Sequence, residues 1–179
     1  LHPNDRRQRQ MCIRDRIGTS GARWFSSIDL SSGFYHIPLR ESDQHLTAYT
    51  LPGVGQFMWR RASMGLTGSP ATFNRVIDMI LNDVEQVVNY VDDILCFTKD
   101  IQSHYSKLRQ VLDRLRKAGL RVNAEKSVFL TTEVDYLGAS VSQHGARPTL
   151  DKCKAVEDLK PPDTRKKLYS VLGLSLIHI

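Results

Sequence analysis

The amino-acid sequence predicts an α+β fold, in which short strands alternate with two amphipathic helices. Residues 87–91 and 94–98 are β-branched and aromatic runs with the composition of two paired strands. Apolar residues recur at helical spacing over residues 73–84 and again over residues 101–115. Strand pairs packed against two such helices make an α+β arrangement.

The other expected elements follow from local signals. A strand over residues 23–30 ends at Ser31-Ser32-Gly33, and residues 33–38 form an irregular connector. Further strands are expected in a hairpin, residues 46–50 and 56–60, and in a last hairpin over residues 134–141 with Gly145.

Capping residues mark the ends of the helices. Ser69 and Pro70 predict an N-cap and a first helical position, and Gly119 ends the second helix. A last helix is expected over residues 149–159, before Pro161-Pro162.

The adjacent Asp92 and Asp93 lie between the two strands of the central hairpin, which places carboxylates at its tip. Aspartate is also common in ordinary turns, so a purely structural role is the alternative. This turn has no glycine and its strands are apolar, however, and neighbouring carboxylates raise each other's pKa unless a cation lies between them. The pair therefore favours a divalent metal site.

A third carboxylate, Asp29, ends the strand over residues 23–30. If this strand pairs with the hairpin at a spacing of about 4.8 Å, Asp29 lies alongside Asp92. Oxygen-only ligands suit Mg²⁺ or Mn²⁺ and not zinc. The layout is that of a two-metal phosphoryl-transfer site, with Asp29 and Asp92 as the bridging ligands and Asp93 more peripheral.

Composition limits the class of protein. The chain has 179 residues, 41% of them hydrophobic, which suits one globular domain, and no stretch approaches a membrane span. The net charge of +6 hints at a polyanionic partner, although residues 1–16 supply +3 of it. Three widely spaced cysteines indicate neither a zinc cluster nor a disulfide framework and fit a reducing, intracellular setting.

Several ordered segments resemble those of reverse transcriptases, most of all the gypsy-type LTR retrotransposon branch. The resemblance covers about residues 19–174. Its motifs are Phe25-Ser26-Ser27-Ile28-Asp29-Leu30-Ser31-Ser32-Gly33, Leu66-Thr67-Gly68-Ser69-Pro70-Ala71-Thr72-Phe73-Asn74, Tyr90-Val91-Asp92-Asp93, Gly119-Leu120-Arg121-Val122-Asn123-Ala124-Glu125-Lys126, Tyr136-Leu137-Gly138 and Ser170-Val171-Leu172-Gly173-Leu174.

The resemblance implies the palm of a right-hand polymerase, an antiparallel sheet backed by helices. Residues 19–142 would form the palm with its primer-grip hairpin, and residues 143–174 the start of a thumb. The implied activity is RNA-directed DNA polymerisation, in which a primer 3′-hydroxyl attacks a dNTP. Its partners would be an RNA or DNA template with primer, the dNTP, and the rest of a Pol polyprotein with its fingers, RNase H and integrase. The intact element would form a cytoplasmic particle.

The resemblance also assigns further roles. Leu30 would lend a backbone carbonyl to the site, and Phe34 would form an aromatic gate that excludes a 2′-hydroxyl. Phe34 as a core residue and Tyr35 as the gate are the alternatives. Met64 occupies a slot near the dNTP, where it offers no polar contact. Lys126 matches a lysine that protonates the departing pyrophosphate, with an exposed lysine in a strand connector as the alternative.

Nucleic-acid contacts are expected at Tyr90 and Val91 of the Asp-Asp box. The resemblance also suggests that Tyr136, Leu137 and Gly138 form the turn that grips the primer end.

Residues 1–18 and 175–179 do not fit this pattern. We expect the first to be a disordered or foreign tail and the second a foreign tail. The fingers lysine and arginine that hold the triphosphate are missing from the motif set, so we expect the isolated chain to be inactive. Two other functions remain open: a catalytically dead retroelement remnant that at most binds nucleic acid, and a metal-dependent nuclease that uses the same carboxylates.

Overall fold

The computed structural model describes residues 21–150, 154, 164–165 and 168–169. The chain divides into two compact units, Leu1–Arg147 and Pro148–Ile179. Both tails lie outside the described residues, as does most of the helix expected at 149–159. Within the described residues, no helix is both long and apolar enough to cross a membrane.

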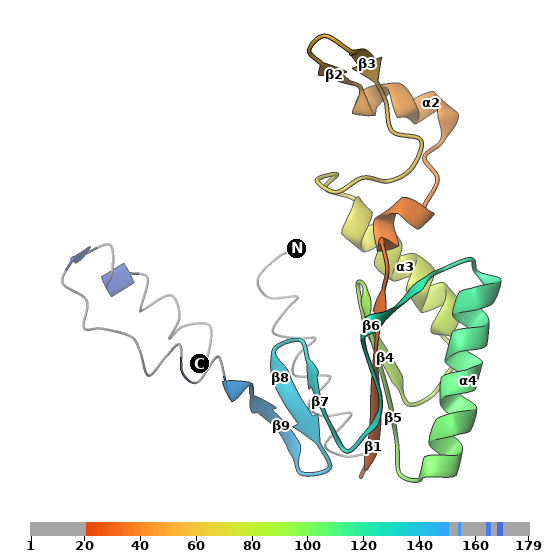
Figure 1. The fold of residues 1–179 in the computed structure, drawn as a ribbon, viewed down its shortest axis with the longest axis vertical. Coiled ribbons are helices and arrows are strands. Elements are labelled where there is room, and N and C mark those ends of the chain that lie inside the picture. The colour runs from red at the N-terminus through yellow and green to blue at the C-terminus, as the bar shows by residue number, and fades with distance from the viewer. Residues whose placement is uncertain (1–20, 151–153, 155–163, 166–167, 170–179) are drawn as a thin grey trace. The chain divides into compact units, whose positions relative to one another are not determined.

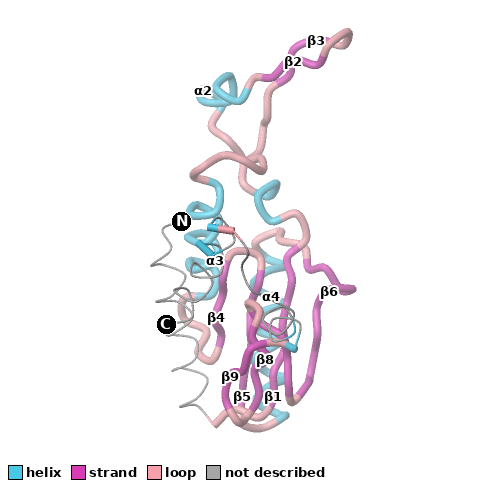
Figure 2. Tube along the Cα trace, turned by 90° about the vertical axis from the view of Figure 1, so that its left-hand side faces the viewer, coloured by secondary structure: helices cyan, strands magenta, loops and turns pink. Residues whose placement is uncertain are grey.

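A four-stranded sheet forms the centre of the first unit, with the strand order β4-β5-β1-β6 (Figure 2). Strand β1 (Trp24–Leu30) pairs antiparallel with β5 (Asp93–Thr98) on one side and β6 (Val122–Thr131) on the other. Strand β4 (Val87–Tyr90) pairs antiparallel with β5. The positions predicted for β1, β4 and β5 are confirmed to within one residue.

Strand β6 corresponds to no predicted element, and it includes the segment expected to be a connector. Its pairing with β1 shifts register twice, between Phe25 and Ser27 and between Ser27 and Asp29. It lies at the edge of the sheet, and no residue in it is fully buried. Without a buried face, the strand has no apolar alternation by which a sequence pattern could find it.

The two faces of the main sheet are covered by different elements, the long helices on one side and a smaller sheet on the other (Figure 1), and each face buries its own core. On one face, Ile28 and Ile94 pack against the helices α3 (Ser69–Leu81) and α4 (Ile101–Lys117). On the other, Phe25 and Leu95 pack against a smaller sheet that follows β6 in the chain. Because side chains alternate along a strand, Asp29 and Asp93 belong to the second face.

The smaller sheet contains the three strands β7 (Glu133–Tyr136), β8 (Ala139–Ser142) and β9 (Gly145–Pro148). Its first two strands confirm the predicted last hairpin. Val134, Tyr136 and Val141 point into the second core, and each is at most 5% exposed. The small sheet therefore covers part of the face on which the aspartates lie.

The connection between β1 and α3 is partly helical. It contains the 3₁₀ turn η1 (Gly33–His36), where an irregular connector was expected, followed by α2 (Glu41–Gln44) and η2 (His45–Thr47). The predicted hairpin is confirmed in shorter form, as β2 (Tyr49–Leu51) and β3 (Gly55–Phe57), with Tyr49 opposite Phe57. Tyr49 stacks on Phe57 and also contacts Trp59, which stacks on Tyr35.

The helix ends confirm one predicted cap and correct another. Gly119 has a φ of +73°, and the backbone N–H groups of Gly119 and Leu120 donate to the last turn of α4 in a Schellman arrangement. The N-cap of α3, however, is Gly68. The prediction of a Ser69 N-cap is wrong because Ser69 is already helical and its hydroxyl donates to the Ser63 carbonyl at 3.2 Å.

A buried polar cluster joins α4 to the main sheet. The His104 side chain is fully buried, with Nε2 2.8 Å from Ser26 Oγ and Nδ1 2.9 Å from Thr98 Oγ1. Ser26 Oγ also accepts a hydrogen bond from the Leu130 backbone N–H of β6. Burial lowers the pKa of His104, because the charged imidazolium loses its hydration.

Acid should therefore destabilise the fold through His104. A histidine with a lowered folded-state pKa stabilises the fold fully above its unfolded pKa of about 6.5, and this contribution is lost as the pH falls below that value. We expect the free energy of unfolding, measured in urea at pH 7.5 and 5.5, to fall more for the wild type than for His104→Gln. The exposed His144→Gln serves as the control. An equal fall in the wild type and His104→Gln would contradict the assignment.

Candidate active site

The backbone ladder of the main sheet brings two aspartates opposite each other. Asp29, at the end of β1, is the cross-strand partner of Asp93, at the start of β5. The ladder continues past this pair, because the Leu30 N–H donates to the Asp92 carbonyl at 2.9 Å. On its other side, the Asp29 N–H donates to Ser127 Oγ at 3.1 Å. Asp29 therefore lies between the hairpin and the edge strand.

The position of the hairpin tip differs from the prediction. Tyr90 pairs with Asp93, so the two loop residues are Val91 and Asp92. The sequence suggested that Asp29 lies alongside Asp92. Its cross-strand partner in the structure is instead Asp93. The turn begins one residue earlier than expected because Asp93 already has strand geometry.

The three carboxylates repel one another in a partly buried place. Burial raises the pKa of Asp92, and the charges of Asp29 and Asp93 raise it further. Burial and the charge of Asp29 also raise the pKa of Asp93, while the nearby Lys126 acts in the opposite direction. The site therefore holds more negative charge than its own cations balance.

Asp92 lies in a cradle that depends on a glycine. Its Oδ1 is buried and has no hydrogen-bond partner among the described residues. A Cβ added to Gly33 would lie 2.1 Å from this oxygen and 2.8 Å from Phe73 Cζ. No side chain larger than hydrogen fits at position 33 while Asp92 and Phe73 stay in place.

The donor set fits a hard divalent cation in its chemistry. Asp29, Asp92 and Asp93 offer oxygen ligands only, and the unpartnered Oδ1 of Asp92 is an acceptor that a cation could satisfy. In the described part of the chain, however, no three His, Cys, Asp or Glu side chains are gathered so that they could hold a metal ion. The three residues offer ligand atoms of the right chemical type, but their side chains do not converge on one point.

The other residues expected near the dNTP differ in their surroundings. Leu30 is buried in the core, and Phe34 is half-buried against the same core, with its ring edge-to-face on Phe73 at 5.7 Å. Tyr35, the rival for the gate, instead stacks on Trp59. Met64 is exposed.

Lys126 lies on β6 with an exposed side chain, near enough to Asp93 for their charges to interact. The strand connector considered as its alternative location is therefore wrong. Its expected role stays a prediction.

The expected primer-grip turn is tied to the aspartate hairpin. Tyr136 pairs with Ala139, and the two residues between them, Leu137 and Gly138, have φ values of +51° and +75°. The Tyr136 hydroxyl donates to the Asp93 backbone carbonyl at 3.3 Å. Burial raises the pKa of Tyr136, so this hydroxyl stays protonated. The small sheet thus contacts the backbone of a candidate catalytic residue.

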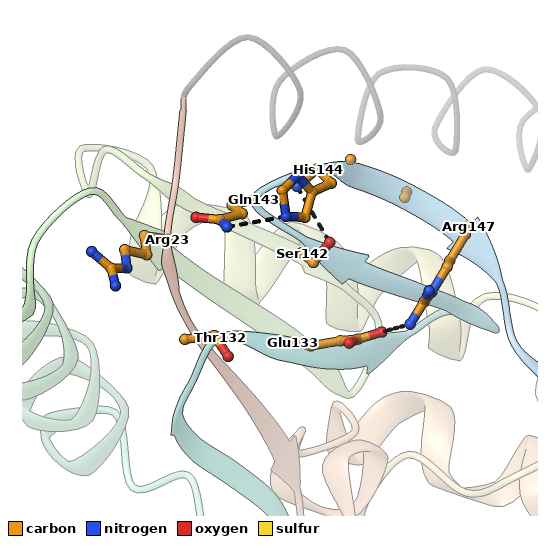
Figure 3. Close-up of a pocket in the computed structure, with 9 residues that line it drawn as sticks. Arg23, Thr132, Glu133, Ser142, Gln143, His144 and Arg147 are labelled. Atoms are coloured by element: carbon orange, nitrogen blue, oxygen red, sulfur yellow. Dashed lines mark hydrogen bonds and ion pairs between the residues drawn. The ribbon is translucent and has the colours of Figure 1, made fainter.

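A pocket of about 390 Å³ lies elsewhere, on the small sheet (Figure 3). Its lining includes Arg23, Gln143, His144 and Arg147, and Arg147 forms an ion pair with Glu133 at 2.5 Å. None of the three aspartates lines it. It is separate from the candidate site.

Residues 3–141 match the family model described as reverse transcriptase (RNA-dependent DNA polymerase). The chain belongs to the reverse transcriptase family. The match starts upstream of residue 19, where the resemblance seen in the sequence begins.

Related proteins point to the same branch of reverse transcriptases. The chain is 42% identical over 157 residues to the retrovirus-related Pol polyprotein from transposon opus of Drosophila melanogaster, covering 86% of this chain and 16% of that protein. It is 34% identical over 158 residues to the retrovirus-related Pol polyprotein from transposon gypsy of the same species, covering 86% of this chain and 15% of that protein. The chain spans less than a fifth of the length of these relatives.

Solved structures confirm the polymerase fold. A foamy viral protease-reverse transcriptase in complex with double-stranded DNA superposes with a TM-score of 0.81 at 36% identity, covering 85% of this chain and 27% of that one. A foamy viral protease-reverse transcriptase in complex with an RNA/DNA hybrid gives a TM-score of 0.77 at 36% identity, covering 85% of this chain and 21% of that one. The predicted α+β class and polymerase architecture are confirmed.

Sequence reasoning missed three contacts at this candidate site: Gly33 against Asp92 Oδ1, the Val91 N–H that donates to Asn74 Oδ1, and the Tyr136 hydroxyl that donates to the Asp93 carbonyl. Asn74 lies on α3, three residues before Ile77 and seven before Leu81. A polar residue at the spacing of an apolar stripe was the signal that could have found it. The steric role of Gly33 has no sequence signal, because its neighbours come from distant segments.

Replacing Gly33 should destabilise the fold around the candidate site. We expect Gly33→Ala to lower the free energy of unfolding by about 1–3 kcal/mol, because the new methyl group overpacks against Asp92 and Phe73. The control is Gly68→Ala, where an added Cβ meets nothing within 4 Å. Urea unfolding of both variants measures the difference, and equal stability would contradict the close approach.

Proposed function

We propose that this chain is the palm segment of an RNA-directed DNA polymerase, which adds dNTPs to a primer 3′-hydroxyl on an RNA or DNA template. The observation that carries the proposal is the pairing of Asp29 with Asp93 beside the Asp92 turn, in a chain of the reverse transcriptase family. All three carboxylates of the motif set are present.

The proposed roles of the aspartates follow from their electrostatics. Asp29, Asp92 and Asp93 would together hold Mg²⁺ or Mn²⁺, which would activate the attacking hydroxyl and stabilise the leaving oxygens. The raised pKa values of Asp92 and Asp93 support this, because a bound cation would relieve the repulsion that contributes to them.

Nearby residues would position the other reactants. Lys126 carries a positive charge close to Asp93, which is compatible with a proton donor to the departing pyrophosphate. Leu30 would offer its carbonyl, and the half-buried Phe34 ring would lie under the sugar of the dNTP. Met64 is exposed and could contact the nucleotide only through apolar atoms.

Nucleic-acid contact is proposed at two hairpin ends. Tyr90 is the last paired residue of β4 and Val91 the first residue of the turn that follows it, and Leu137 and Gly138 form the turn of the small sheet. The bond between Tyr136 and Asp93 supports a shared function, since it fixes one turn relative to the other. Foamy viral relatives solved with an RNA/DNA hybrid and with double-stranded DNA support a primer–template as the ligand.

The wider setting is proposed from the relatives. They are Pol polyproteins of which this chain covers less than a fifth. We propose that fingers, RNase H and integrase segments accompany it in an intact element and that the polymerase works in a cytoplasmic particle. The expected division into a palm over residues 19–142 and a thumb that starts within 143–174 belongs to the same proposal.

Asp92→Asn should abolish activity and leave the fold intact. In a longer polymerase segment that carries its fingers, we expect Mg²⁺-dependent primer extension to disappear. We also expect the melting temperature in EDTA to rise, because one of three repelling charges is removed. The control is Asp113→Asn, an exposed carboxylate on α4. Extension by Asp92→Asn at a near wild-type rate would refute the site, and no extension by the wild type would favour a catalytically dead remnant.

Phe34→Ala should change sugar selection. If the ring lies under the sugar, its removal leaves room for a 2′-hydroxyl, and discrimination against NTPs should collapse while dNTP incorporation continues. A core role predicts instead a loss of about 3–5 kcal/mol in stability together with all activity. Incorporation of dNTP and NTP is measured side by side with a melting curve, with Tyr35→Ala for comparison. An unchanged sugar preference in a folded, active Phe34→Ala would make Tyr35 the gate.

A further inference from the structure

The turn that carries Asp92 has an unusual backbone. Only Val91 and Asp92 separate the last paired residues of β4 and β5. Val91 has a φ of +54°, whereas Asp92 is not among the residues with positive φ. Two-residue hairpin turns with positive φ at the first position alone favour glycine there. A β-branched valine at this position is a conformational outlier that needs outside support.

Asn74 provides support from a different element. Its Oδ1 accepts a hydrogen bond from the Val91 N–H at 2.7 Å. Asn74 is 7% exposed and follows the fully buried Phe73 on α3, so its position is fixed by the core. The amide of the strained residue is thus held by a helix on which the main sheet packs.

Asp92 directly follows Val91 and has contacts of its own. The backbone carbonyl of Asp92 accepts a hydrogen bond from the Leu30 N–H, and the side-chain Oδ1 of Asp92 lies against Gly33. If the turn adopted an ordinary conformation at Val91, the direction of the next residue would change, and Asp92 would leave this cradle. The hydrogen bond from the Val91 N–H to Asn74 is made in the conformation in which Asp92 occupies this cradle.

We propose that Asn74 is a positioning residue for nucleotide transfer. It acts through Val91, by holding the turn in the left-handed conformation that places Asp92, and it contacts no reactant itself. This inference rests on the proposed polymerase function. A merely structural role for Asn74 would affect activity only as far as it affects stability.

The first test uses the 179-residue chain and needs no activity. Hydrogen exchange of the Val91 amide is measured by NMR in the wild type and in Asn74→Leu, a variant of similar volume without an acceptor. We expect exchange to become about tenfold faster or more in Asn74→Leu, because the amide loses its partner. The matched control is Asn89→Leu, since Asn89 also links the hairpin to α3, through Asp78 at 3.1 Å, but lies outside the turn. Unchanged exchange in Asn74→Leu would overturn the proposal.

The second test measures primer extension in a longer polymerase segment with its fingers. We expect Asn74→Leu to lower kcat about 10- to 100-fold, with the primer–template Kd and the melting temperature little changed. Adding Val91→Gly should restore part of the lost kcat, because glycine adopts positive φ without strain. An unchanged kcat, or a double variant no better than Asn74→Leu alone, would overturn the proposal. If the wild type extends no primer, the proposed function fails, and the exchange measurement alone decides whether Asn74 holds the turn.

Discussion

The backbone ladder between β1 and β5 holds three like charges together against their own repulsion. Its hydrogen bonds fix Asp29 opposite Asp93 and tie the Asp92 carbonyl to Leu30. Carboxylates that are partly buried near one another raise each other's pKa, and Asp92 and Asp93 both show this effect. Such an arrangement persists only where the surrounding structure determines it, and here the surrounding structure is the buried centre of the sheet.

The two faces of this sheet have different tasks. The helix-covered face holds an apolar core and the hydrogen bonds that join His104 to Ser26 and Thr98. The opposite face carries Asp29 and Asp93 and is partly covered by the small sheet. The Tyr136 hydroxyl donates to the Asp93 carbonyl at 3.3 Å, so the strand that precedes the candidate primer-binding turn contacts the backbone of a candidate metal ligand.

In several places a contact with another segment outweighs a local preference of the chain. The local sequence favours Ser69 as the N-cap of α3, but its hydroxyl donates a hydrogen bond to the Ser63 carbonyl instead. Val91 would avoid a positive φ on its own, but Asn74 holds its amide. Strand β6 has no buried face and exists because β1 offers a free edge. For Val91 and for β6 the deciding partner lies outside the local window of sequence.

The sequence by itself determined the α+β class, the catalytic carboxylate candidates, the central hairpin and the reverse transcriptase family. These follow from apolar periodicity, turn composition and motif order, which are local properties of the chain. Only the tertiary structure decided that Asp29 faces Asp93, that Gly33 leaves room for Asp92 and that Asn74 reaches Val91. The first relation depends on strand register, which a one-residue difference in where a turn begins changes, and the other two depend on contacts between segments far apart in the chain.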